Sequence, residues 1–175
     1  MAGADITRAK LAPRFAELHD KTVIDVGAGT GGYAALVPLS APYVGVDFDA
    51  RKLQQLRLNI PGRAVVQADA TCLPVAGKSF DCGIAIALAH HLDDAGLELM
   101  LSEMSRILTG RMIFLDPVWN PRSLRGRALW SIDRGAFPRP AEVLLDQIAG
   151  RFDVQSVERY AIHHHYLICV ATPRS

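Results

Sequence analysis

The stretch from Val23 to Gly32, Val-Ile-Asp-Val-Gly-Ala-Gly-Thr-Gly-Gly, joins an apolar segment to a glycine-rich turn. Glycine tolerates positive φ and has no Cβ, so such a turn lets the backbone approach a ligand closely. Two spacings fit these glycines. Gly27-x-Gly29-x-x-Gly32 is typical of loops that bind a dinucleotide, whereas Gly27-x-Gly29-x-Gly31 is typical of loops that bind a nucleoside-based methyl donor. The glycines alone leave both ligands open.

Acidic and imidazole side chains recur where later apolar segments end. In chain order they are Asp47, Asp69, the His90-His91 pair and Asp116. If those segments are parallel strands, their carboxyl ends meet at one edge of the sheet, where ligands of such folds bind. We therefore expect these side chains to gather with the glycine loop at one edge.

Apolar segments of strand character alternate with segments of helical spacing along the chain. Strands are expected at residues 22–26, 43–47, 64–67, 80–88, 111–115, 154–162 and 166–172. Helices are expected at residues 7–18, 33–38, 51–59, 94–108 and 141–152, with Asp94 as the N-cap of the fourth and Gly110 as its end. This alternation predicts a doubly wound, mostly parallel α/β sheet. His163-His164-His165 is too short to connect parallel strands, so the last two strands should form an antiparallel hairpin.

Length and composition fit one domain over residues 1–175, with a helical segment at 1–20 ahead of the first strand. The chain has 175 residues, a net charge of +1 and 50% hydrophobic residues, a balance that points neither to nucleic acid nor to an acidic tail. Three scattered cysteines without a C-x-x-C pair favour a reducing compartment. The longest apolar run, residues 82–89, is far shorter than the roughly 20 residues that span a bilayer, and no signal peptide is evident. We expect a cytoplasmic protein without a transmembrane segment.

Four stretches together resemble the class I S-adenosylmethionine (SAM)-dependent methyltransferases, of the small single-domain methyltransferase 11 type. They are the glycine loop at 23–32, Gly-Val-Asp-Phe-Asp at 45–49, Ala-Asp-Ala-Thr-Cys-Leu-Pro at 68–74 and Ala-Leu-Ala-His-His-Leu at 87–92. The resemblance implies a Rossmann-like sheet of seven strands in the order 3-2-1-4-5-7-6, with an antiparallel C-terminal strand. It also implies SAM as the cofactor and S-adenosylhomocysteine as its product.

The resemblance also implies a set of cofactor residues: Asp25, Gly27, Ala28, Gly29, Gly31, Asp47, Phe48, Asp69, Ala70 and Ala87. Asp47 would accept hydrogen bonds from both ribose hydroxyls, a role that excludes NADP but not NAD. Asp69 would bind the adenine amino group, with the Ala70 N–H facing the ring and Phe48 lying against it. Asp25 suits the ammonium group of SAM and would repel a pyrophosphate. Each of three residues also has a structural alternative. Asp25 could be a strand carboxylate bonded to loop N–H groups, Phe48 a core phenylalanine and Asp69 a solvated turn aspartate.

His90 and His91 follow the fourth strand, which would place them beside the transferred methyl group. The family's reaction is an in-line displacement at the methyl carbon, so most of the enzyme's task is to hold the acceptor in line. A general base is needed only where the acceptor carries a proton, and histidine can accept one near pH 7. Both histidines are therefore candidate catalytic residues, with a packing role at the helix start as the alternative.

The acceptor side is expected to include Asp116, Trp119, Arg134, His163 and His165. Residues 117–140 contain five arginines and two tryptophans and should form a basic flap over that side. Such a flap suits a small-molecule or a phosphorylated, carrier-linked or lipid-linked acceptor, or a peripheral membrane contact, whereas solubilising arginines are the alternative. The near-neutral charge and the absence of an Asn/Asp-Pro-Pro-aromatic signature disfavour nucleic acid. In the histidine run only His163 and His165 share a face, so no metal site is expected.

Two other functions fit parts of this pattern. A non-catalytic SAM-binding or partner subunit would keep the same cofactor residues, and a partner subunit could also complete an open acceptor site. An NAD-dependent oxidoreductase would share Asp47 but would explain neither Asp25, nor Asp69, nor the terminal hairpin. The identity of the acceptor and its reacting atom stay open.

Overall fold

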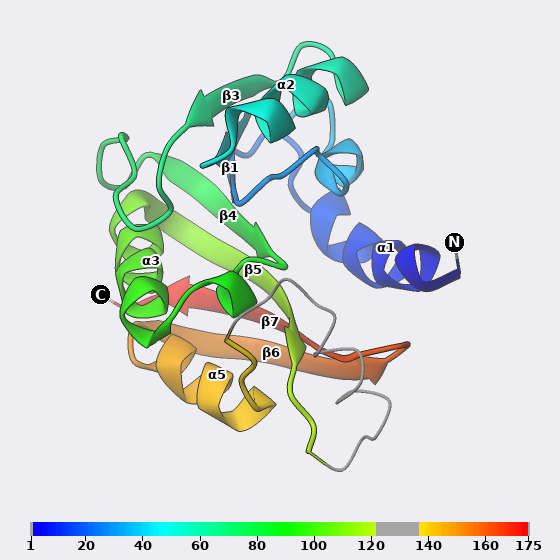
Figure 1. Cartoon of the computed structure of the whole chain (residues 1–175). Coiled ribbons are helices and arrows are strands. Elements are labelled where there is room, and N and C mark those ends of the chain that lie inside the picture. The colour runs from blue at the N-terminus through cyan, green and yellow to red at the C-terminus, as the bar shows by residue number, and fades with distance from the viewer. Residues whose placement is uncertain (1, 122–136, 175) are drawn as a thin grey trace.

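Seven strands form one sheet in the computed structural model of the chain, which describes residues 2–121 and 137–174. The strand order is β3-β2-β1-β4-β5-β7-β6 (Figure 1). The strands are β1 (Val23–Val26), β2 (Tyr43–Asp47), β3 (Ala64–Gln67), β4 (Phe80–Ile86), β5 (Leu108–Val118), β6 (Phe152–Ala161) and β7 (His165–Pro173). The first five pair in parallel, and β7 pairs antiparallel with both β5 and β6. The predicted strand order and the predicted terminal hairpin are confirmed.

Helices and short 3₁₀ turns cover both faces of the sheet (Figure 1). They are α1 (Ala2–Ala16), η1 (Ala34–Leu36), α2 (Ala50–Asn59), η2 (Ala89–His91), α3 (Asp94–Ile107) and α5 (Ala141–Ala149). Leu11 and Phe15 of α1 pack with Ala34 of η1 in one apolar cluster. Leu101 of α3 and Ile148 of α5 belong to a second, larger cluster. Burial of each such leucine, isoleucine or phenylalanine side chain contributes roughly 1.5–3 kcal/mol, so both layers hold the sheet in place.

Two helices differ from their predicted extents near prolines. The helix expected at residues 33–38 is only the three-residue turn η1, because Val37, which precedes Pro38, takes an extended conformation with ψ 126°. In contrast, α1 begins earlier than predicted and continues through Pro13. A proline in a helix removes one backbone donor, and here the fully buried Leu11 and Phe15 on either side keep the helix packed.

Both predicted ends of α3 were wrong in detail. The N-cap is Asp93 rather than Asp94, because the Asp93 side chain accepts a hydrogen bond from the Gly96 N–H at 2.7 Å. The helix also ends before Gly110, which lies inside β5. A Cβ at Gly110 would lie 2.3 Å from the Asp81 carbonyl oxygen, so this glycine permits the close approach of two strands and does not end the helix.

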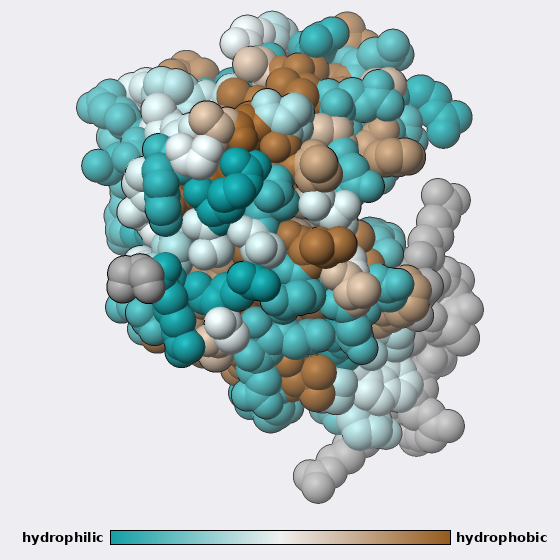
Figure 2. Space-filling view, turned by 90° about the vertical axis from the view of Figure 1, so that its left-hand side faces the viewer, coloured by the Kyte–Doolittle hydropathy of each residue, from teal (hydrophilic) through white to brown (hydrophobic). Residues whose placement is uncertain are grey.

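Figure 2 shows the side of the molecule that lies on the left in Figure 1. Hydrophilic side chains cover most of this face, and the apolar side chains lie there in separate groups. None of the helices in the described ranges has the length and hydrophobicity that crossing a membrane would require.

Candidate functional site

The glycine loop follows β1 and turns through left-handed backbone at every second residue. Gly27, Gly29 and Gly31 have φ values of 75°, 56° and 80°, whereas Gly32 is not among the positive-φ residues. The Gly27 N–H donates to the Val46 carbonyl at 2.8 Å, which fixes the start of the loop against β2. Because side chains rarely adopt such φ values, the spacing that the backbone requires is Gly27-x-Gly29-x-Gly31.

A pocket of about 470 Å³ lies beside this loop, at the carboxyl ends of β1, β2, β3 and β4. We call it the glycine-loop pocket; its wall consists of Val26, Gly27, Val46, Asp47, Phe48, Lys52, Ala68, Asp69, Ala70, Ala87, Leu88, His91 and Leu92. Seven of the predicted site residues are therefore brought together: Gly27, Asp47, Phe48, Asp69, Ala70, Ala87 and His91. Ala28, Gly29 and Gly31 shape the loop but do not line the pocket.

The two acids of the pocket wall are held by backbone donors. Asp47 is 8% exposed, and its carboxylate accepts hydrogen bonds from the Gly29 and Asp49 N–H groups, both at 2.9 Å. Asp69 accepts from the N–H and the hydroxyl of Thr71 at 2.8 and 2.7 Å, and these hydrogen bonds, the backbone one first, lower the pKa of its carboxyl group. Both carboxylates are thus fixed acceptors for donor groups of a ligand.

Phe48 differs from the core alternative considered for it, since 74% of the residue is exposed at the pocket wall. A large aromatic side chain in this position offers a flat apolar surface to a ligand. Ala87, at the end of β4, has a φ of 53°, an uncommon backbone conformation for a residue other than glycine. This strained backbone conformation of Ala87 therefore lies in the wall of the pocket.

Asp25 lies beneath the loop and does not line the glycine-loop pocket. It is 5% exposed, and its carboxylate accepts a hydrogen bond from the Tyr43 hydroxyl at 2.8 Å. Burial raises the pKa of Asp25 to about 7, although the Tyr43 hydrogen bond opposes this rise. A carboxyl group in such surroundings responds strongly to a nearby cation. Its predicted contact with an ammonium group stays a prediction.

His90 and Asp116 form a buried pair between the ends of β4 and β5. His90 is 7% and Asp116 is 1% exposed, and His90 Nδ1 lies 2.6 Å from Asp116 Oδ1. The second Asp116 oxygen accepts from the Ala89 N–H at 2.6 Å, and burial raises the pKa of this carboxyl group. Asp116 was expected on the acceptor side, but its carboxylate is taken up by this pair. His91, with its ring centroid 4.0 Å from that of His90, is the exposed member at the pocket wall.

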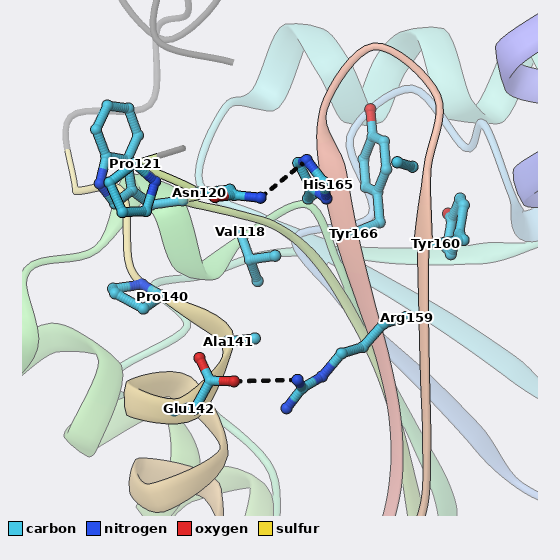
Figure 3. A pocket seen from close by; sticks show the side chains of 12 residues that line it. Val118, Asn120, Pro121, Pro140, Ala141, Glu142, Arg159, Tyr160, His165 and Tyr166 are labelled. Atoms are coloured by element: carbon cyan, nitrogen blue, oxygen red, sulfur yellow. Dashed lines mark hydrogen bonds and ion pairs between the residues drawn. The ribbon is translucent and has the colours of Figure 1, made fainter. Parts of the chain in front are cut away.

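A second pocket, of about 730 Å³, lies between the end of β5, the start of α5 and the β6–β7 hairpin (Figure 3). We call it the hairpin pocket; its wall consists of Val118, Trp119, Asn120, Pro121, Pro140, Ala141, Glu142, Arg159, Tyr160, Ala161, His165 and Tyr166. Figure 3 shows two polar pairs with Val118 between them. Asn120 Nδ2 lies 3.1 Å from His165 Nε2, and Arg159 pairs with Glu142 at 3.0 Å.

The predicted acceptor residues are only partly brought together. Trp119 and His165 line the hairpin pocket, whereas His163 does not. Arg134, like Arg122, Arg125, Arg127 and Trp130 of the predicted flap, lies outside the described residues. The fifth flap arginine, Arg139, is not a solvated cation, since only 8% of it is exposed.

Several residues of the hairpin pocket were missed by sequence reasoning. Asn120, Tyr160 and Tyr166 carry no motif, and only their position beside the predicted strand ends could have suggested them. Among the described histidines, cysteines and acids, no three gather closely enough to hold a metal ion.

The glycine-loop pocket fits the cofactor that the sequence implies. A Cβ at Gly27 would lie 3.0 Å from Leu88 Cδ1, so the loop and the opposite wall already approach closely. The wall offers the carboxylates of Asp47 and Asp69 against the ammonium of Lys52, together with apolar side chains. These carboxylate acceptors suit the hydroxyl and amino groups of a nucleoside, which can donate hydrogen bonds, better than they suit the phosphates of a dinucleotide.

Comparison with known proteins points to the same chemistry. A family model described as a methyltransferase domain matches residues 23–110. The chain is 32% identical to a fatty-acid O-methyltransferase of Mycolicibacterium smegmatis over 112 residues, which cover 61% of this chain and 40% of that protein. It is 33% identical to a phthiotriol/phenolphthiotriol dimycocerosates methyltransferase of Mycobacterium ulcerans over 107 residues, which cover 57% and 39%. The chain thus spans about two fifths of the length of these curated relatives.

Solved structures share the fold at low sequence identity. The YcgJ protein of Bacillus subtilis has a TM-score of 0.81 at 14% identity, over 98% of this chain and 99% of that one. The magnesium protoporphyrin IX methyltransferase of Synechocystis, solved with S-adenosylhomocysteine bound, has a TM-score of 0.77 at 16% identity, over 99% and 83%. These likenesses show that the shared fold continues beyond the matched segment to the terminal hairpin.

Proposed function

We propose that this chain, which belongs to the methyltransferase-domain family, is a class I SAM-dependent methyltransferase that methylates an oxygen atom of a lipid-like acceptor. The single observation that carries this proposal is the pair of neighbouring pockets at the carboxyl edge of the sheet. One offers fixed carboxylates and suits a nucleoside; the other is lined largely by aromatic, proline and small apolar residues. The printed names of the two curated relatives, a fatty-acid O-methyltransferase and a methyltransferase of a mycobacterial lipid, support the same acceptor class.

The glycine-loop pocket is the proposed cofactor site. When bound, SAM supplies a methyl group on a sulfonium, which is a good leaving group. Asp47 would accept hydrogen bonds from the ribose hydroxyls, and Asp69 would accept one from the adenine amino group beside the exposed ring of Phe48. Asp25 would contribute negative charge beneath the loop, where its buried carboxyl group favours a nearby cation.

The hairpin pocket is the proposed acceptor site. Trp119, Tyr166 and Val118 offer apolar surface to a hydrocarbon or ring, and the Asn120–His165 pair offers polar atoms to an oxygen-bearing end. The protein's principal contribution to the rate is then to align that oxygen with the methyl group.

His90 and His91 are the proposed proton acceptors for a hydroxyl substrate. Because the Asp116 carboxylate can only accept, it favours the His90 tautomer with the proton on Nδ1. His91 lines the cofactor pocket, so we assign it the position nearest the acceptor, with His90 fixed behind it. A carboxylate substrate has no proton to lose and would not need either histidine.

Transfer of a radiolabelled methyl group from SAM tests this proposal. Hexadecanoic acid and hexadecanol are the probes, and glycerol and acetate are the matched polar controls without a chain. We expect labelling of a long-chain probe and none of the short controls. Binding of SAM without labelling of either long-chain probe would refute the lipid-like acceptor, and absence of transfer to any acceptor would favour a non-catalytic subunit.

A further inference from the structure

Arg139 is a buried cation whose partners are mostly main-chain carbonyl groups. It is 8% exposed, and its guanidinium donates to the carbonyl of Ala89 at 3.0 Å and to that of Leu92 at 2.8 Å. Its Nε also donates to the Asp94 carboxylate at 2.9 Å. A buried charge is tolerated only when it is paired and hydrogen-bonded, so these contacts account for its burial. These three partners lie on the chain between β4 and the first turn of α3, and the guanidinium also donates to the Phe137 carbonyl at 3.3 Å.

The backbone around Arg139 is bonded to both neighbouring segments. We call residues 137–140 the strap. On one side, the Phe137 N–H donates to the His90 carbonyl at 3.1 Å. On the other side, the Arg139 carbonyl accepts from the Trp119 N–H at 2.7 Å. The strap therefore joins the histidine loop to the chain that follows β5.

The strap also lies between the two pockets. The loop at residues 87–92 supplies His91 and three further residues to the glycine-loop pocket. Pro140, the last residue of the strap, and Trp119, which follows β5, line the hairpin pocket. We propose that Arg139 is a positioning residue that holds loop 87–92 in its cofactor-binding shape and couples that pocket to the hairpin pocket. Only the functional role of this coupling rests on the proposed function, in which the hairpin pocket binds the acceptor.

The carbonyl contacts, rather than the ion pair, should account for the effect of Arg139. The Asp94 side chain is 81% exposed, and ion pairs with one solvent-exposed partner contribute little. The planar guanidinium reaches two carbonyls and a carboxylate at once, which a lysine ammonium on a flexible stem does less well. Arg139→Lys should therefore act as a partial loss, and Asp94→Asn as a small one.

Hydrogen exchange of the full chain, with and without S-adenosylhomocysteine, tests the coupling. In the unsubstituted protein this ligand should slow amide exchange in the strap, although no strap residue lines the glycine-loop pocket. In Arg139→Gln the strap should lose this protection, and the His91 and Leu92 amides should exchange at least about tenfold faster. The dissociation constant of S-adenosylhomocysteine should rise at least about tenfold, which corresponds to about 1.4 kcal/mol.

Arg151→Gln is the matched control, because Arg151 pairs with Glu98 of the same helix α3 at 2.7 Å but contacts neither pocket. It should leave strap protection and ligand affinity unchanged. Unchanged affinity and unchanged strap protection in Arg139→Gln would overturn the proposal. If Arg139→Gln does not fold, Arg139→Lys decides, since wild-type behaviour of that variant in both measurements contradicts it. Neither readout requires an acceptor, so failure of methyl transfer to lipids would leave this test intact.

Discussion

Replacing Asp25 by asparagine tests whether the acid beneath the glycine loop reduces the stability of the protein without ligand. Burial raises the pKa of this carboxyl group from 3.8 to about 7. Between pH 3.8 and about pH 7, Asp25 of the folded protein holds a proton that the same residue of the unfolded chain has released. Stability is therefore highest below the unfolded pKa and falls as the pH rises towards the folded pKa. The full difference corresponds to about 4 kcal/mol, since each pKa unit is about 1.4 kcal/mol.

The asparagine side chain in Asp25→Asn would keep an acceptor for the Tyr43 hydroxyl but could not ionise. The stability of Asp25→Asn relative to the unsubstituted protein should therefore grow by about 2–3 kcal/mol between pH 5 and pH 8, and then level off. Urea unfolding at a series of pH values, without ligand, measures this difference. The same variant should bind SAM more weakly, because the proposed counter-charge to the cofactor is lost.

Asp81→Asn provides a control with the opposite sign. The N–H and the hydroxyl of Thr22 both donate to the Asp81 carboxylate, and these bonds lower its pKa. The contribution of Asp81 to the free energy of unfolding should be present at neutral pH and should disappear as the pH falls through the pKa of Asp81 in the folded protein. Two results would refute the conclusion that the buried carboxylate of Asp25 destabilises the folded protein. One is a stability gain of Asp25→Asn that does not depend on pH, and the other is a loss of stability of this variant at pH 8.

Three further predictions test the site. Gly31→Ala should lower the free energy of unfolding by at least about 1–2 kcal/mol, because φ is +80° at this residue. Gly32→Ala should change it by less than about 0.5 kcal/mol. Equal effects of the two substitutions in urea unfolding would contradict the Gly27-x-Gly29-x-Gly31 spacing. Asp47→Ala should weaken S-adenosylhomocysteine binding about 100-fold or more in calorimetry, since each hydrogen bond to a charged group contributes about 1.5–3 kcal/mol; an unchanged affinity would exclude the ribose contact. Asp116→Asn should slow methyl transfer to a hydroxyl acceptor about 100-fold while sparing a carboxylate acceptor. Equal slowing of both would argue against a role of the two histidines and Asp116 in accepting the proton.

Sequence patterns were sufficient for the sheet because its strands differ from the rest of the chain in composition. β1 is buried at all four of its residues, three of which are apolar, and this pattern is typical of a strand that is covered on both faces. The three-residue link at His163–His165 allowed only an antiparallel hairpin. The acids Asp47 and Asp69 could be placed at one pocket because parallel strand ends must meet at one edge.

Contacts that depend on main-chain groups could not be foreseen. The partners of Arg139 are carbonyl oxygens, which every residue possesses, so the sequence does not distinguish it from a surface arginine. Asp93 and Asp94 are equally good N-caps by type, and only the backbone geometry selects the first. Asp116 was expected to face the acceptor because its strand position is right, but its pairing with His90 depends on how the following loop folds back.

The brevity of η1 determines the electrostatic character of the glycine loop. In dinucleotide folds a full helix begins at this point, and its dipole, equivalent to about half a positive charge, favours a pyrophosphate. The three residues of η1 supply only a small part of such a dipole, while Asp25 and Asp47 add negative charge nearby. In the proposed cofactor site, this arrangement would oppose a sulfonium cation less than a full helix N-terminus would. The short turn therefore makes this loop better suited to a cationic cofactor than to an anionic one.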